Sequence, residues 1–139
     1  MQRTRSTPSA PSVDDRFLGR EPLVRLYSLP RAGTATPFSV GAAEYMNNGG
    51  FSTQDLTRQQ VWNEQALRNV THVVGADVGV DTESALDVQM LSQAADGAAL
   101  WFWNSPKWLY ALAVDVGNAA VKPNRISSTT GVNAFHPSA

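Results

Sequence analysis

Acidic side chains gather in one stretch of the chain, where carboxylates could bind a cation or move protons. Asp77, Asp81, Glu83 and Asp87 follow one another closely. Their spacing lacks the aspartate-rich loop pattern, with its central glycine, that binds calcium. Asp81 is instead a good N-cap residue, and Glu83 falls in a first helical turn, where the helix dipole favours negative charge. We therefore predict a solvated connector and a helix start here, and no metal site.

The other residues able to do chemistry are scattered. The chain has two histidines, His72 and His136, which lie far apart in sequence, and it has no cysteine. Disulfides, cysteine zinc sites and thiol catalysis are thereby excluded. Neither a G-x-S-x-G nucleophile motif nor a glycine-rich phosphate loop is present. We therefore predict no catalytic residue and no cofactor, and hence a protein that is not an enzyme.

Aromatic side chains concentrate around Pro106, and they are the strongest signal in the sequence. Each large aromatic removes roughly 150–250 Å² from water when it is covered. Three interpretations stay open: burial in the core of one molecule, an interface between subunits, and a belt at a membrane surface. The candidate interface residues are Trp101, Phe102, Trp103, Trp108 and Tyr110.

The hydrophobic pattern predicts a mainly α fold with three helices. The first, over about 53–74, follows Ser52 as N-cap with Asp55 three residues later and ends before Gly75. The second, 82–103, is apolar on two sides, and the third, 106–121, is apolar nearly all round. Segments 22–29 and 70–74 leave a strand open as an alternative, the latter because it is β-branched.

Composition divides the chain into an extended basic arm over 1–51, a helical body over 52–121 and an extended polar tail over 122–139. Residues 1–31 hold six arginines and three acidic residues, whereas 32–139 hold five basic and nine acidic residues. A basic arm on an acidic body is typical of an interaction tail. Its candidate contact residues are Arg16, Arg20 and Arg25.

The third predicted helix carries one polar stripe, formed by Asp115 and Asn118. A carboxylate on an apolar helix is costly to bury unpaired. Asp115 therefore either forms a buried ion pair that fixes the register between subunits or simply faces water.

The surplus of apolar helix surface favours a non-enzymatic structural subunit of a larger assembly, such as a virion, capsid-associated or filament component. A basic arm ahead of a small helical body is similar in layout to the coat proteins of helical viruses. We expect a homo-oligomer, or other subunits of one assembly, as partners. One alternative is an adaptor whose arm binds nucleic acid, and another is a peripheral membrane-surface protein. The sequence shows no secretory signal and no transmembrane segment, so virion or cytoplasm is the expected location.

Overall fold

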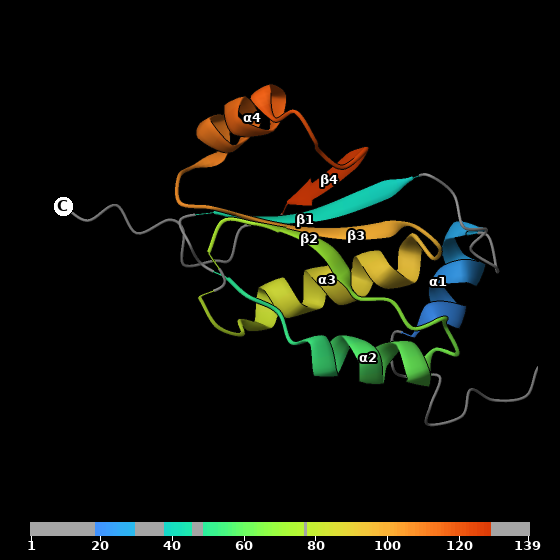
Figure 1. The fold of residues 1–139 in the computed structure, drawn as a ribbon. Helices are drawn as coiled ribbons and strands as arrows, with labels where there is room; N and C mark the ends of the chain where they lie inside the picture. The colour runs from blue at the N-terminus through green and yellow to red at the C-terminus, as the bar shows by residue number, and fades with distance from the viewer. Residues whose placement is uncertain (1–18, 30–37, 46–48, 77, 129–139) are drawn as a thin grey trace, which may run out of the picture.

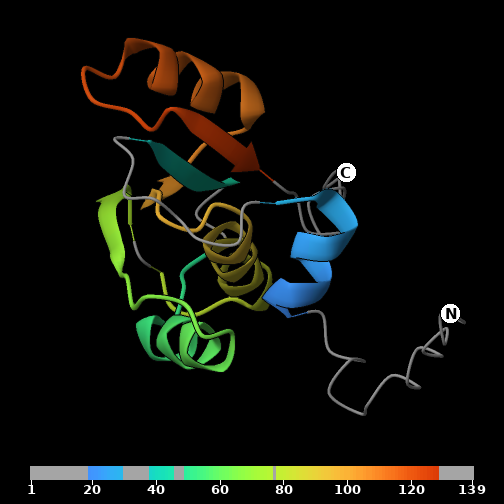
Figure 2. The ribbon, with the colours of Figure 1, turned by 90° about the vertical axis from the view of Figure 1, so that its right-hand side faces the viewer.

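The computed structural model describes residues 19–29, 38–45, 49–76 and 78–128, which form a three-layered α/β fold (Figure 1). A parallel sheet lies between α2 and α3 on one face and α4 on the other, and the layers are visible from the end in Figure 2. The elements follow in the order α1 (Arg20–Tyr27), β1 (Ser39–Tyr45), α2 (Thr53–Trp62), β2 (Val70–Val74), α3 (Thr82–Ala94), β3 (Ala99–Ser105), α4 (Leu109–Asn118) and β4 (Arg125–Ser128).

The four strands are ordered β2-β3-β1-β4 and are all parallel. Strand β1 is central and pairs with β3 along its whole length, from Ser39 opposite Ala99 to Tyr45 opposite Ser105. The chain leaves the carboxyl end of β1 toward α2 and leaves the carboxyl end of β3 toward α4, on opposite faces of the sheet (Figure 1). In open α/β sheets a crevice for ligands forms where neighbouring strands part in this way.

Strand β3 supplies both hydrophobic cores because successive side chains of a strand point to opposite faces. Leu100 and Phe102 enter the core beneath α2 and α3, together with Leu56 and Val88. Trp103 enters the core beneath α4. The apolar run in β3 is therefore covered on both sides, as is usual for an inner parallel strand.

The prediction of a mainly helical, three-helix body was wrong. The first predicted helix ends at Trp62, where Glu64 adopts a positive φ of 54° and turns the chain, and 70–74 is the strand β2. The second ends at Ala94, and its remaining apolar residues form β3. A segment that is apolar on two sides fits an inner strand as well as it fits a buried helix, and periodicity alone cannot separate the two.

The predicted arms also carry regular structure. Residues 22–29 fall largely in the helix α1, which buries Leu23 and Val24, rather than in a strand. Strand β1 also lies within 1–51, and β4 lies within 122–139. The predicted arm residue Arg16 lies outside the described residues.

The helix-start signals at Ser52 and Asp81 are confirmed. The Ser52 hydroxyl accepts a hydrogen bond from the backbone N–H of Asp55, and the Asp81 carboxylate accepts from Glu83 and Ser84. Helix α4, by contrast, begins at Leu109 rather than at Pro106. Within the described part of the chain, no helix combines the length and hydrophobicity needed to cross a bilayer.

Candidate active site

Polar side chains from three elements gather at the carboxyl edge of the sheet. Glu44 and Asn104 occupy matching positions near the ends of β1 and β3. Residues in register on adjacent strands project from the same face, so these two side chains are neighbours. Helix α3 runs antiparallel to the strands, and its first turns, which carry Asp81, Glu83 and Asp87, therefore begin at this edge (Figure 1).

Glu44 is a buried carboxyl group with only 4% of its surface exposed. The Ser84 hydroxyl hydrogen-bonds to one side of it, whereas Glu44 Oε1 has no hydrogen-bond partner among the described residues. Burial raises the pKa of this carboxyl from 4.5 to about 7. The negative charge of Asp87, and more weakly those of Glu83 and Asp81, adds to the rise, while the Ser84 hydrogen bond opposes it. Glu44 therefore holds its proton up to near-neutral pH.

The start of α3 is fixed by its cap. Asp81 Oδ2 accepts from the backbone N–H groups of Glu83, at 2.9 Å, and Ser84, at 3.2 Å. It also lies 3.5 Å from the Ser84 hydroxyl, which connects the cap to Glu44. Glu83 and Asp87, four residues apart, share one face of the helix. Both side chains are half-buried, so each is partly enclosed by the protein and partly accessible to solvent.

Asn104 joins the loop after β1 to the loop after β2. Its side-chain amide donates to the carbonyl of Gly49, at 3.0 Å, in the loop after β1, and to that of Ala76, at 2.7 Å, in the loop after β2. Its Oδ1 has no partner among the described residues, although the residue is 1% exposed. Buried acceptors without donors are uncommon in native proteins and are often found at functional sites.

Gly49 lies where these side chains converge. A Cβ there would overlap the Ser84 hydroxyl and would lie 3.0 Å from Glu44 Cγ. The absence of a side chain thus allows the loop to close over Glu44 while its carbonyl accepts from Asn104. The arrangement is a packed polar cluster around the buried Glu44 carboxyl, near the half-buried carboxylates of Glu83 and Asp87.

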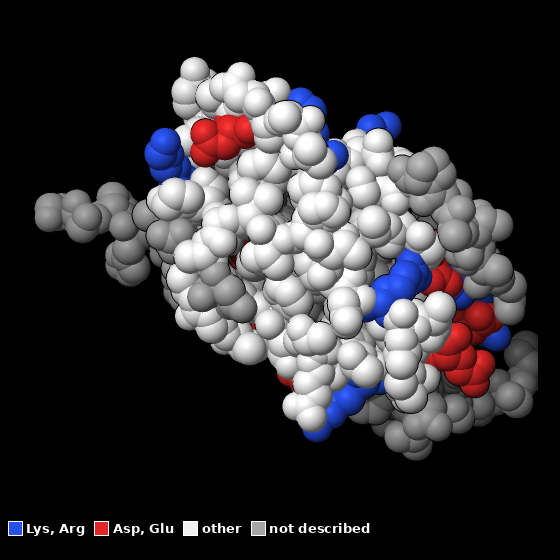
Figure 3. Space-filling view, viewed as in Figure 1, with Lys and Arg blue, Asp and Glu red and all other residues white. Residues whose placement is uncertain are grey.

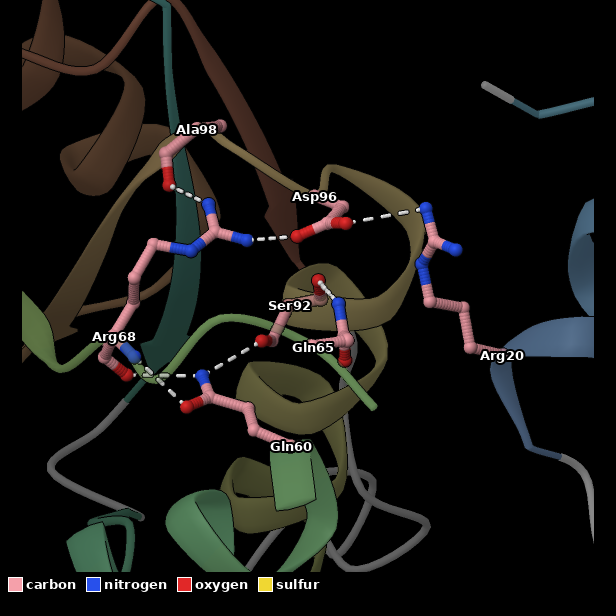
Figure 4. A network of polar contacts seen from close by, with 7 residues as sticks. All are labelled: Arg20, Gln60, Gln65, Arg68, Ser92, Asp96 and Ala98. Carbon is pink, nitrogen blue, oxygen red and sulfur yellow. Dashed lines mark hydrogen bonds and ion pairs between the residues drawn. The ribbon is translucent and has the colours of Figure 1, made fainter. Parts of the chain in front are cut away.

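The opposite edge of the sheet carries a second polar network, shown in Figure 4. Asp96 forms ion pairs with Arg20, at 3.2 Å, and with Arg68 (Figure 4). Arg68 also donates to the Ala98 carbonyl, and its own backbone exchanges two hydrogen bonds with the Gln60 side chain. These bonds tie α1, α2 and the start of β3 together, so we assign this network a structural role.

The predicted interface residues fall into buried and exposed sets. Trp101, Phe102 and Trp103 are buried in β3, and Trp101 stacks on His72 with ring centroids 3.9 Å apart. Trp108 and Tyr110, at the start of α4, are 42% and 81% exposed. Figure 3 shows an acidic group on the surface over α4 with basic groups on either side of it, and a broad uncharged surface below that helix. That helix contains one acidic residue, Asp115.

The remaining predicted residues are also near the surface. Arg20 pairs with Asp96, as described above, and Arg25 forms an exposed pair with Glu21 in α1. Asp115 and Asn118 are both exposed on α4. Whether any of these residues contacts another subunit stays a prediction.

Sequence reasoning identified the acidic stretch but explained it only by solvation and capping. It missed Glu44 and Asn104. The available signal was a polar residue closing a run of small or apolar residues, Val40–Ala43 before Glu44 and Ala98–Trp103 before Asn104. Among the described residues no group of histidine, cysteine and acidic side chains has the arrangement to hold a metal ion. The carboxyl groups of Glu44, Glu83 and Asp87 are of the type that can transfer protons to and from a ligand.

The site thus belongs to an α/β protein with an acid-rich cluster at the carboxyl edge of a parallel sheet. No family model matches the chain, and no solved structure matches it. Physarolisin from Physarum polycephalum, a protease of the sedolisin family, is 32% identical over 109 residues. The match covers 76% of this chain but 19% of physarolisin, so the chain spans about a fifth of the length of this curated relative.

This similarity overturns the prediction of a non-enzymatic structural subunit. The relative points to an enzymatic family, and the α/β fold is not that of a helical virion or filament component. The prediction from the sequence was wrong because carboxylates in a solvated helical turn and carboxylates in an active site can follow the same local sequence pattern.

Proposed function

We propose that this chain forms part of a peptidase related to physarolisin and contributes the carboxyl groups that transfer protons during peptide hydrolysis. The observation that carries the proposal is the buried Glu44 carboxyl at the carboxyl edge of the sheet, close enough to Asp87 and Glu83 for their charges to raise its pKa. Carboxyl groups with perturbed pKa values are typical of acid–base sites. The similarity to a protease supports the choice of reaction.

In this proposal Glu83 and Asp87 act on the substrate, and Glu44 is a positioning residue. A deprotonated carboxylate takes the proton of an attacking hydroxyl as the new bond to the substrate carbonyl forms. The same proton then passes to the amide nitrogen as the carbon–nitrogen bond breaks, so the carboxylate is regenerated. Closely placed carboxyl groups favour a state in which one of them keeps a proton.

The attacking hydroxyl is not one of the serines at this site. Ser84 and Ser105 are 0% and 1% exposed, so neither side chain can reach a bound peptide in this arrangement. We propose that the nucleophile is water or a hydroxyl outside the described residues.

The test uses two proteins, the purified chain and a chimaera of physarolisin in which this chain replaces the matching segment. Each is assayed for cleavage of a denatured protein from acid to neutral pH. Glu83→Gln and Asp87→Asn should each lower kcat by at least about a hundredfold, the usual contribution of a general acid or base. Glu64→Gln, an exposed change near the opposite edge of the sheet, should have no effect. Cleavage that survives both of these substitutions, or a failure of the chimaera as well as the chain to cleave, would contradict the proposal.

A further inference from the structure

We propose that Asn69 is the acceptor of an N-linked glycan, which covers the edge strand β2. The sequence holds one Asn-x-Ser/Thr triplet, Asn69-Val70-Thr71, and its middle residue is not proline. Such a triplet is the acceptor signal for N-linked glycans. The site lies at the amino end of the strands, opposite the end that carries Glu44, and the proposal does not depend on the proposed function.

The fold places this triplet at the surface, outside any helix. The helix predicted over 53–74 would have contained Asn69, but α2 ends at Trp62 and Asn69 directly precedes β2. The Gln60 side chain exchanges two hydrogen bonds with the backbone of Arg68, which fixes the chain just before the triplet. Asn69 itself is exposed, and its side chain forms no hydrogen bond with any described residue. The amide is therefore available to carry a sugar.

The other two residues of the triplet have structural roles. Val70 packs against the core beneath α2 and α3. The Thr71 hydroxyl donates to the Leu100 carbonyl, at 3.0 Å, across the pairing of β2 with β3. These contacts explain the valine and the threonine without a glycan. They do not explain the asparagine, which is the residue that the modification needs.

Strand β2 is an edge that needs protection. It is the last strand on its side of the described sheet (Figure 2), and Thr71, His72 and Val73 are exposed. Edge strands expose unpaired backbone groups that can pair with another chain, and proteins block this with charged residues, proline or bulges. A bulge interrupts the pairing near Val70, but β2 contains neither proline nor an acidic residue, lysine or arginine. A bulky, solubilising glycan at the start of β2 would supply the missing protection.

The modification is a group transfer from a lipid diphosphate that carries an oligosaccharide. The side-chain nitrogen Nδ2 of Asn69 forms a bond with the anomeric carbon of the first sugar. The bond between that carbon and the diphosphate oxygen breaks, and the lipid diphosphate leaves. The amide nitrogen loses one proton in the exchange, so nothing is oxidised or reduced. The proposal implies that the chain enters the secretory pathway, where this donor is available.

The test is expression of the full chain in yeast behind a cleavable secretory leader. Secreted and cell-retained chains are both analysed by intact mass and by peptide mapping. The wild type should carry one high-mannose glycan that an endoglycosidase removes. Treatment with peptide N-glycosidase in heavy-oxygen water should label residue 69. An unglycosylated wild type, or a label at another residue, would overturn the proposal.

Matched variants separate the triplet from its surroundings. Asn69→Gln and Thr71→Ala should each abolish the glycan, whereas Thr71→Ser keeps the hydroxyl and should retain it. Asn118→Gln removes another exposed asparagine, outside any such triplet, and should also retain it. Loss of the glycan in Asn118→Gln, or its survival in Asn69→Gln, would contradict Asn69 as the acceptor.

Light scattering tests whether the glycan covers β2. The mass of the glycosylated wild type should stay constant as its concentration rises, whereas that of Asn69→Gln should increase toward a dimer. Adding Val73→Lys to Asn69→Gln should reverse this increase, because a charged side chain on an edge strand opposes pairing. Equal association of the wild type and Asn69→Gln, or association that Val73→Lys does not reduce, would overturn the covering of β2.

Discussion

Replacing Glu44 by glutamine should stabilise the protein at pH 8 and leave its stability nearly unchanged at about pH 4. The Glu44 carboxyl is buried, and its pKa is raised from 4.5 to about 7. Glutamine has nearly the same shape, cannot ionise and can still accept the Ser84 hydrogen bond. The substitution therefore isolates the cost of a negative charge at this position.

The sign follows from proton binding in the two states. Between pH 4.5 and about 7 the folded protein keeps the Glu44 proton, whereas the unfolded chain releases it. Unfolding thus releases a proton, so the free energy of unfolding falls as pH rises through this window and levels off above it. The difference between the Glu44 pKa values of the unfolded and folded states corresponds to roughly 3 kcal/mol in the free energy of unfolding. Below pH 4.5 the carboxyl is protonated in both states and carries no such cost.

The measurement is urea unfolding of the wild type and of Glu44→Gln at several pH values between about 4 and 8. At pH 8 the free energy of unfolding of the variant should exceed that of the wild type by about 2 to 3 kcal/mol, and this difference should vanish toward pH 4. Glu64→Gln serves as the control for removing an exposed carboxyl group and should change the free energy of unfolding by no more than about 0.5 kcal/mol. A difference for Glu44→Gln that is constant with pH would show that Glu44 ionises normally and would refute the reasoning.

Three further predictions concern the framework of the site, and urea unfolding checks each of them. Gly75→Ala should lower the free energy of unfolding by about 3 kcal/mol or more, because a Cβ at Gly75, whose φ is +86°, would overlap the Asn104 carbonyl. Gly79→Ala should lower it by only about 1 kcal/mol, from backbone strain, because Gly79 has a φ of +103° but open space around it. Equal costs would mean that the close approach to Asn104 does not matter. Phe102→Ala should cost about 3–5 kcal/mol, since the ring is completely buried between the sheet and its helices; a cost below about 1 kcal/mol would contradict this core. Asp96→Asn should lower the free energy of unfolding by about 3 kcal/mol, because it removes the ion pairs of Asp96 with Arg20 and Arg68. Arg25→Met, which removes an exposed ion pair, should lower it by less than about 1 kcal/mol. The reverse order would contradict the structural role assigned to the Asp96 network.

The exposed aromatic residues of α4 have no assigned role. Trp108 and Tyr110 lie at the start of that helix, next to the carboxyl end of β3. The ring of Trp108 contacts Tyr45 with centroids 5.5 Å apart, which anchors the helix start to β1. Whether the remaining exposed surface contacts a second subunit stays a prediction.

The amino-acid sequence by itself determined the features that depend on neighbours in the chain. Ser52 and Asp81 begin helices because each side chain caps backbone N–H groups two or three residues away. The absence of cysteine excluded thiol and disulfide chemistry without any structure. The β-branched segment 70–74 carried a signal for the strand that it forms.

Only the tertiary structure decided which residues form the candidate site. Glu44 ends a strand far from α3 in sequence, and its pKa changes because folding buries it and brings Asp87 beside it. The run Leu100–Trp103 became a strand because a parallel sheet could cover both of its faces, which no local pattern reveals. Capping is a contact within one helical turn, whereas strand pairing and the gathering of like charges require long-range closure of the chain. For that reason the helix starts could be predicted, and the candidate active site could not.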